Sequence, residues 1–388
     1  MAQTGSAARR QALIAWAICV CLATPVLLWK LRWGEVPRDL AVYREAGRVL
    51  SQGGDLYGPG FGRDLKVPLP FTYPPLAGIL AVPLGWLPGW VLTLVWTGFS
   101  LTALVALVGL AFRPLLDARP GRSGLLWGLI AGLFAWTTPV TDTLSLGQIS
   151  LFVVLACALD STVTGRGRGV LVGVATAVKL TPGLFTVYFL VTRQWRAALL
   201  STVTTASLWL VAWIALPSLS DTYWTQVVRH TERIGDVAFY ANQSINGALH
   251  RLGAPGWLWL PLALAGAVLG LTRARTAHTG GQPLAAATLV GLASLLISPI
   301  SWQHHAGWVI PAIGVLVGDG RSAGRLRAAL GIMVVILLRL PLIGSATSIP
   351  VISSVAENAY VITYWGLLLW LPTSTTRATN TRLLTTSP

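Results

Sequence analysis

Glu35-Val-Pro-Arg-Asp39-Leu-Ala-Val-Tyr43-Arg-Glu-Ala-Gly47 begins the first large polar segment of the chain. It follows directly on an apolar segment that ends near Trp33, so its charges lie at a membrane surface. Side chains three or four residues apart are neighbours on a helix, and Asp39, Tyr43 and Ala46 therefore share one face. Two interpretations stay open for this stretch alone. It is an amphipathic surface helix whose acids pair with its own arginines, or a helix that presents Asp39 for chemistry.

Composition places the chain among integral membrane proteins. Of the 388 residues, 54% are hydrophobic and only 11% are charged, whereas soluble domains contain about 25% charged residues. Apolar runs long enough to cross a bilayer recur along the whole chain. The expected fold class is therefore an all-α polytopic membrane protein, and a soluble enzyme is excluded. Cys19, Cys21 and Cys157 lie in apolar runs and are expected to be reduced core residues.

We expect about 12 transmembrane helices in a single membrane domain, residues 1–372, followed by a disordered cytoplasmic tail, residues 373–388. Two of the spans are short and flank Lys179-Leu-Thr-Pro182, so they are expected to turn near the outer leaflet. The proline-bounded apolar segment 74–87 is expected to form a juxtamembrane or re-entrant helix. The expected spans are 11–31, 89–112, 124–138, 145–160, 168–178, 181–192, 197–216, 257–271, 284–298, 305–317, 328–343 and 358–372.

The net charge of +15 follows the topology of a membrane protein. With the N-terminus inside, the cytoplasmic segments hold 16 of the 28 Lys and Arg residues but only 3 of the 13 acids. This is the positive-inside asymmetry of plasma-membrane proteins, and it explains the basic balance without a nucleic-acid partner. The polar outer segments are the loops 32–88 and 217–256 and two short turns near 141–148 and 298–305. Any chemistry is therefore expected on the extracytoplasmic face.

Several polar and aromatic residues of this outer face have two possible roles. Tyr57 and Tyr73 are either members of an interfacial aromatic belt or part of a sugar-binding surface. The strip Asn242-Gln243-Ser244 is expected to hydrogen-bond a sugar or a lipid headgroup. Lys179 and Arg339 are cations within or beside apolar spans, where charges either mark a functional pocket or reach out to the surface.

His304 and His305 follow Trp302 at the outer end of a span. Adjacent histidines on a helix point about 100° apart, which is a poor geometry for binding one ion, and no carboxylate pair with metal-ligand spacing accompanies them. We therefore expect no metal site, although divalent-metal dependence stays open. The sequence carries no Walker loop, GxGxxG motif, nucleophile elbow or CxxC pair, and no cofactor is expected.

A set of short motifs, in order along residues 11–372, resembles glycosyltransferase family 87, whose members include actinobacterial mannosyltransferases that use polyprenyl-phosphate-mannose. The motifs are Asp39-Leu-x-x-Tyr43, Gly54-x-Leu56-Tyr57, Phe71-Thr-Tyr73-Pro74-Pro75, Gly147-Gln148, Lys179-Leu-Thr-Pro182, Arg193-Gln-Trp195-Arg196, Asn242-Gln243-Ser244-x-x-Gly247 and Ser298-Pro299-x-Ser-Trp302-x-His304-His305. The resemblance implies a GT-C type fold with juxtamembrane helices in the first outer loop. It also implies an extracytoplasmic hexosyltransferase with Asp39 as the catalytic base.

The chemistry of such a transfer agrees with the outer-face residues. A sugar phosphate already has a good leaving group, whereas the acceptor hydroxyl needs a base, and a carboxylate within hydrogen-bond reach serves. One essential carboxylate fits a single displacement with inversion. Cations stabilise the charge that grows on the leaving phosphate, and the candidates for this role are His304, His305, Lys179, Arg251 and Lys66. The candidates for binding sugar or acceptor are Tyr43, Tyr57, Tyr73, Gln148, Asn242, Gln243 and Trp302.

The expected function is thus transfer of a mannosyl residue, with an α-1,2 linkage, from polyprenyl-phosphate-mannose to a glycolipid or lipoglycan at the plasma membrane. An arabinofuranosyltransferase that uses polyprenyl-phosphate-arabinose keeps a similar motif pattern and stays an alternative. A flippase or transporter of lipid-linked sugars is the rival class, because many spans and broken helices suit it. Against it, the polar residues gather on one face, and an observation that separates the two classes is whether Asp39 and the pair His304-His305 converge on one outer cavity open to lipid.

Overall fold

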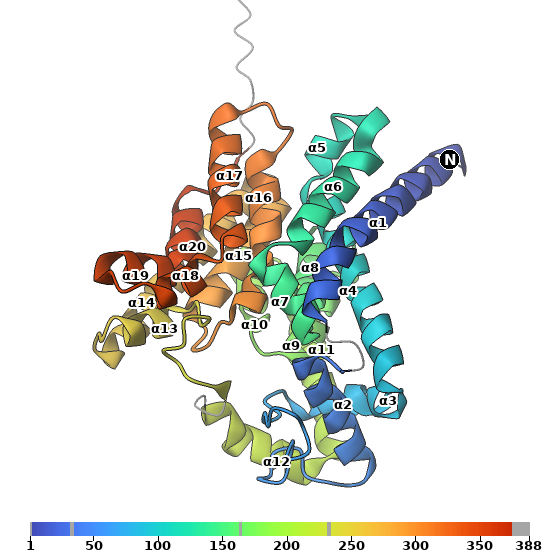
Figure 1. The fold of residues 1–388 in the computed structure, drawn as a ribbon, viewed down its shortest axis with the longest axis vertical. Coiled ribbons are helices and arrows are strands. Elements are labelled where there is room, and N and C mark those ends of the chain that lie inside the picture. The colour runs from blue at the N-terminus through green and yellow to red at the C-terminus, as the bar shows by residue number, and fades with distance from the viewer. Residues whose placement is uncertain (1, 32–34, 163–164, 231–233, 375–388) are drawn as a thin grey trace, which may run out of the picture.

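The computed structural model describes residues 2–31, 35–162, 165–230 and 234–374, and within them every regular element is a helix (Figure 1). A single isolated antiparallel bridge joins Asn242 to Trp302. The predicted all-α class is confirmed. The α-helices are α1 (Ala2–Lys30), α2 (Arg38–Ser51), α3 (Pro75–Trp86), α4 (Gly89–Ala111), α5 (Arg113–Asp117), α6 (Ser123–Ala135), α7 (Thr138–Leu146), α8 (Ser150–Thr162), α9 (Val170–Val178), α10 (Gly183–Val191), α11 (Trp195–Ala215), α12 (Pro217–Thr225), α13 (Ile245–Arg251), α14 (Trp259–Thr279), α15 (Pro283–Ile297), α16 (Val309–Val317), α17 (Ala323–Leu337), α18 (Leu340–Ala346), α19 (Pro350–Glu357) and α20 (Ala359–Trp370).

Short 3-10 helices connect some of these elements. They are η1 (Pro120–Arg122), η2 (Val227–Arg229), η4 (Gly256–Leu258) and η5 (Gln303–Trp308). The predicted disordered tail, 373–388, lies outside the described residues from position 375 onward.

Among the residues that the structure describes, four helical segments are long and apolar enough to cross a bilayer: Ser6–Lys30, Gly89–Ala111, Trp195–Ala215 and Gly256–Thr279. Many large apolar side chains on them are exposed, as expected of a surface that lipid tails cover. Two bent helix pairs raise the number of spans to 6. The polytopic membrane fold is confirmed, but the predicted count of about 12 spans is not. Helices such as α9 and α10, with 9 residues each, are shorter than the roughly 20 residues of a full crossing.

Two pairs of consecutive helices are bent. The α6–α7 pair bends by 73° and the α17–α18 pair by 50°. The second helix of each pair has a proline at its second residue, Pro139 and Pro341, a position where a helix tolerates proline because the first-turn N–H has no partner within the helix. The predicted outer turn near 141–148 is therefore mostly the helix α7. The predicted span 328–343 is interrupted at Arg339.

Helix α2 has the predicted amphipathic character. Asp39, Tyr43 and Ala46 are all buried on one face, and α2 packs closely against α3. At Gly47 an added Cβ would lie 2.1 Å from the backbone oxygen of Ala81, so only glycine permits this approach. Segment 74–87 is confirmed as a helix, α3. That it is juxtamembrane or re-entrant stays a prediction, because a bilayer is not part of the structure.

The two large outer loops pack against each other. An aromatic cluster brings Tyr57 and Phe71 of the first loop together with Tyr223 of α12, and the Tyr57 and Tyr223 rings are 5.7 Å apart. In Figure 1 these segments, with α2 and α3, lie at the lower end of the molecule. The N-terminus, α5 and the start of α17 lie at the opposite end, where Arg119 Nη1 donates to the backbone oxygen of Asp319 at 3.1 Å. Between the two ends runs α15, buried on all sides from Ala285 to Leu296.

Candidate active site

One cavity, of about 740 Å³, collects most of the polar residues predicted for the outer face. Its walls come from α2, the segment before α3, α7, the α9–α10 turn, residues 234–241 and the turn before η5. Asp39, His304 and His305 all line this cavity. The predicted site residues that line it are Asp39, Tyr43, Tyr73, Gln148, Lys179, Trp302, His304 and His305.

Asp39 lies in the first turn of α2, and its carboxylate is held from both sides. Arg38 Nε is 3.1 Å from Oδ1, and the side-chain amide of Gln148 donates to Oδ2. The residue is only 8% exposed. A carboxylate oxygen has lone pairs for more than one hydrogen bond, so each oxygen can still accept a proton from a substrate in the cavity. These contacts orient the Asp39 carboxylate. Its charged partner is not buried, because the Arg38 side chain is 47% exposed, so no buried ion pair neutralises the carboxylate.

The orientation of Gln148 is set by two tyrosines. The hydroxyl groups of Tyr43 and Tyr73 donate to its Oε1 at 3.0 and 3.4 Å and are 2.9 Å from each other. The amide nitrogen is therefore turned toward Asp39. Gly147 makes the turn that places Gln148, with φ of 72°, and a Cβ there would lie 2.5 Å from Leu40 Cβ. Glycine is required both for the left-handed backbone and for the close approach to α2.

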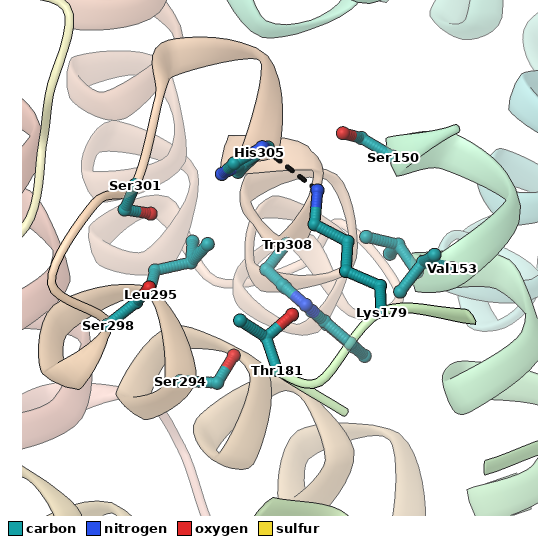
Figure 2. Close-up of a pocket in the computed structure, with 11 residues that line it drawn as sticks. Ser150, Val153, Lys179, Thr181, Ser294, Leu295, Ser298, Ser301, His305 and Trp308 are labelled. Atoms are coloured by element: carbon teal, nitrogen blue, oxygen red, sulfur yellow. Dashed lines mark hydrogen bonds between the residues drawn. The ribbon is translucent and has the colours of Figure 1, made fainter. Parts of the chain in front are cut away.

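Lys179 follows the last residue of α9 and lines the cavity, and Figure 2 shows its side chain directed at His305. Its Nζ is 2.9 Å from His305 Nε2 and 5.7 Å from the centre of the Tyr73 ring. Burial lowers the pKa of Lys179 to about 8, and the charge of Asp39 acts in the opposite direction. Lys179 is thus a cation at neutral pH that has little compensating negative charge beside it, as a phosphate-binding residue requires.

A smaller pocket of about 30 Å³, the size of about one water molecule, adjoins Lys179 and His305. Figure 2 shows the hydroxyl-bearing residues around it, Thr181, Ser294, Ser298 and Ser301, on the far side of the Lys179–His305 hydrogen bond from Ser150. These hydroxyl groups supply a polar lining that can hydrogen-bond a water or a phosphate oxygen.

His304 lies beside His305 on η5, and their rings are perpendicular with centres 4.6 Å apart. Burial, followed by the charges of Lys179 and Arg38, lowers the pKa of His304 well below its usual value, so the ring is neutral at pH 7. Its Nε2 is buried and finds no hydrogen-bond partner within the described part of the chain. A buried polar atom without a partner at a cavity wall indicates a place for a ligand or a water.

Five of the predicted site residues do not line the cavity. Asn242 and Gln243 instead fasten the second outer loop to the turn before η5. Asn242 Oδ1 accepts from the Ser301 amide at 2.9 Å, and Gln243 Nε2 donates to the backbone oxygens of Tyr240 and Glu357. The polar strip interpreted as a sugar-binding surface is thus occupied by backbone groups.

The other three residues have partners of their own. The guanidinium of Arg251 donates to Asn358 Oδ1 and to the backbone oxygens of Phe239 and Asn242. Tyr57 donates its hydroxyl to the backbone oxygen of Tyr73 at 2.8 Å, and Lys66 Nζ is 2.6 Å from Glu35 Oε1. In this structure Tyr57 supports the wall that carries Tyr73 and Arg251 braces the second loop.

The structure adds residues that the sequence did not single out for the site. Asp142 on α7 lines the cavity and forms an ion pair with Arg339, with Nη2 and Oδ1 3.0 Å apart. Tyr240 and Asp236 also face the cavity. A lone acid in a threonine-rich segment, Thr141-Asp142-Thr143, was the available signal for Asp142. No comparable signal marks Tyr240.

Within the ranges that the structure describes, no group of three or more His, Cys, Asp or Glu side chains is placed to hold a metal ion. The side chains that line the cavity include cations and hydrogen-bond donors for an anionic ligand.

A carboxylate, a lysine and two imidazoles that line one cavity suit a polytopic membrane enzyme of group transfer, and the comparisons with known proteins show that class. The family model described as glycosyltransferase family 87 matches residues 71–299. The polyprenol-phosphate-mannose-dependent α-(1-2)-phosphatidylinositol mannoside mannosyltransferase of Mycobacterium tuberculosis is 34% identical, over 81% of this chain and 78% of that protein. The protein of the same description from Mycolicibacterium smegmatis is 36% identical over 78% and 75%. The chain belongs to glycosyltransferase family 87, and this membership carries the GT-C assignment.

Among solved structures, ArnT from Cupriavidus metallidurans bound to undecaprenyl phosphate aligns with 91% of this chain and 75% of that one. The TM-score is 0.44 and the sequence identity 17%.

Proposed function

We propose that this chain transfers a mannosyl residue from polyprenyl-phosphate-mannose to a phosphatidylinositol mannoside, forming an α-1,2 linkage. The two mycobacterial relatives, named for this donor, this acceptor class and this linkage, support the substrates. The observation that carries the proposal is the single cavity in which Asp39, Lys179 and His304 meet.

The cavity supports a single displacement with inversion. The acceptor hydroxyl attacks the anomeric carbon of the donor, the bond from that carbon to the phosphate oxygen breaks, and the polyprenyl phosphate leaves with the electron pair. Asp39, held by Arg38 and Gln148, takes the hydroxyl proton. Lys179 and the neighbouring His304 and His305 face the departing phosphate and stabilise its growing charge. Tyr43, Tyr73 and Trp302, which line the same space, provide hydroxyl and aromatic surface for the sugars.

Purified protein in detergent, supplied with polyprenyl-phosphate-mannose and a phosphatidylinositol mannoside, is expected to form a product larger by one mannose. Mass spectrometry detects the added hexose, and digestion with a linkage-specific α-mannosidase reports the linkage. Polyprenyl-phosphate-arabinose serves as the competing donor. If only the arabinosyl donor is used, the enzyme is an arabinofuranosyltransferase. If neither donor gives product while labelled lipid crosses proteoliposome membranes, the transporter interpretation replaces the enzyme.

The enzyme is proposed to lie in the plasma membrane with the cavity on the extracytoplasmic face. The excess of cations at the end that carries the N-terminus supports this orientation. Single cysteines at the exposed positions Ser51, Ser218 and Ser322, in a background that lacks the three native cysteines, test it on intact cells. An impermeant thiol reagent is expected to label the first two and spare Ser322→Cys. Labelling of Ser322→Cys alone would place the cavity in the cytoplasm.

A further inference from the structure

The cavity contains a second charged cluster that the transfer step does not use. Arg339 and Asp142 form their 3.0 Å ion pair at the two helix breaks, one at the α17–α18 bend and the other on α7 just after the α6–α7 bend. Both side chains line the same cavity as Asp39. The Arg339 side chain is 31% exposed, so its guanidinium is accessible to a ligand.

Two cations act on the acid of this pair. The carboxylate of Asp142 interacts electrostatically with Arg339 first and then with Lys30. Of these two cations only Arg339 lines the cavity. A guanidinium next to an open cavity attracts an anionic group.

The backbone of Arg339 adds an independent observation. Its φ of 55° lies in the left-handed region, and only one other non-glycine residue in the described ranges, Arg193, has positive φ. Side chains other than glycine adopt this conformation at a cost in free energy, and such positions gather at ligand-binding sites. The hydrogen bond to Asp142 uses one of the five N–H donors of the guanidinium, so donors remain for two oxygens of one phosphate.

We propose that Arg339 binds the phosphodiester of an anionic phospholipid acceptor. The inference rests on the proposed function, because that reaction brings two lipid phosphates into one cavity. Lys179 and the histidines take the donor phosphate, and a second cationic position is needed for the phosphate of the acceptor. When the acceptor is absent, Asp142 supplies the counter-charge for the Arg339 guanidinium.

The test compares two acceptors with one donor, polyprenyl-phosphate-mannose. One acceptor is a phosphatidylinositol mannoside and the other an uncharged alkyl α-mannoside, which offers the same hydroxyl groups without a phosphate. In Arg339→Gln the ratio of kcat/KM for the phospholipid to kcat/KM for the alkyl mannoside is expected to fall about tenfold or more. Asp142→Asn, which frees Arg339 from its competitor, is expected to lower the KM for the phospholipid.

Two further variants keep the test decisive. Arg321→Gln removes an exposed arginine at the opposite end of the molecule and is expected to leave the ratio unchanged. The double variant Asp142→Asn/Arg339→Gln removes both charges of the pair. It serves if Arg339→Gln alone fails to fold, because the Asp142 carboxylate is then not left unpaired. The double variant should lower the ratio similarly. Equal effects on both acceptors would overturn the inference while the proposed function stands. A wild-type protein that mannosylates neither acceptor would overturn both.

Discussion

Asp39→Asn is expected to lower the rate of mannosyl transfer by about 10²–10⁴-fold, the range ascribed to general-base catalysis. The amide keeps the shape of the carboxylate, and its one oxygen can still accept from Arg38 or from Gln148, but it cannot take the proton of the acceptor hydroxyl at neutral pH. The loss is therefore expected in kcat, with little change in the KM of the donor. The measurement is steady-state transfer from polyprenyl-phosphate-mannose by purified protein.

The matched control is Glu45→Gln. Glu45 lies on the same helix and pairs with Arg48 at 3.6 Å, outside the residues that line the cavity. The same change from acid to amide there is expected to keep transfer within about twofold of wild type, since surface ion pairs contribute little. Thermal unfolding of both variants close to that of wild type would show that the fold is kept. Turnover near the wild-type rate in Asp39→Asn would exclude Asp39 as the base.

Lys179→Met is expected to raise the KM of the donor by about 10- to 100-fold, because a charge-assisted contact of about 1.5–3 kcal/mol is lost. The KM of the acceptor should change little. Methionine keeps the length of the side chain, so packing against Tyr73 is retained. Arg166→Met, at an exposed position of the loop between α8 and α9, is the matched control and should leave both constants unchanged. An effect confined to the acceptor would assign Lys179 to the other substrate.

The same residue predicts a pH dependence. Burial lowers the pKa of Lys179 to about 8, so the ammonium is present below this pH and is lost as the pH rises through it. The donor kcat/KM of the wild type, which reports groups of the free enzyme, is therefore expected to fall above pH 8. In Lys179→Met this decline should be absent. If the alkaline decline persisted in the variant, another group would be responsible for it.

Local periodicity was enough to predict α2 but not the contacts that make it part of a site. The spacing of Asp39, Tyr43 and Ala46 indicates that they share one face of a helix, and all three are buried in α2. The partner of Asp39 is Gln148, 109 residues away in the sequence. Proximity of that kind depends on how α2 packs against the turn at Gly147, and spacing along the chain does not encode it. The motifs of the family supplied these positions as a set.

The structure differs from the expectation at Asn242 and Gln243, which contact backbone groups, and at two spans, which are bent. Asn242 and Gln243 bind backbone carbonyl and amide groups, which have no sequence signal, so a structural polar strip looks the same as a sugar-binding one. The bends within the apolar segments also leave no clear signal in the sequence. A hydropathy window averages over Pro139 and Pro341 and does not register that the helix turns there by 73° or 50°. Arg339 and Asp142 meet because of those two turns.

The cation proposed to receive the donor phosphate also has a consequence for product release. The donor enters as a phosphodiester with one negative charge, and the spent carrier is a phosphate monoester with close to two near pH 7. Lys179, half-buried beside His305, is expected to attract the more highly charged species more strongly. Release of the used carrier is therefore expected to be slow, and accumulated polyprenyl phosphate is expected to inhibit competitively with respect to the donor. The output of the enzyme would then depend on how fast the membrane removes and recharges its lipid carrier.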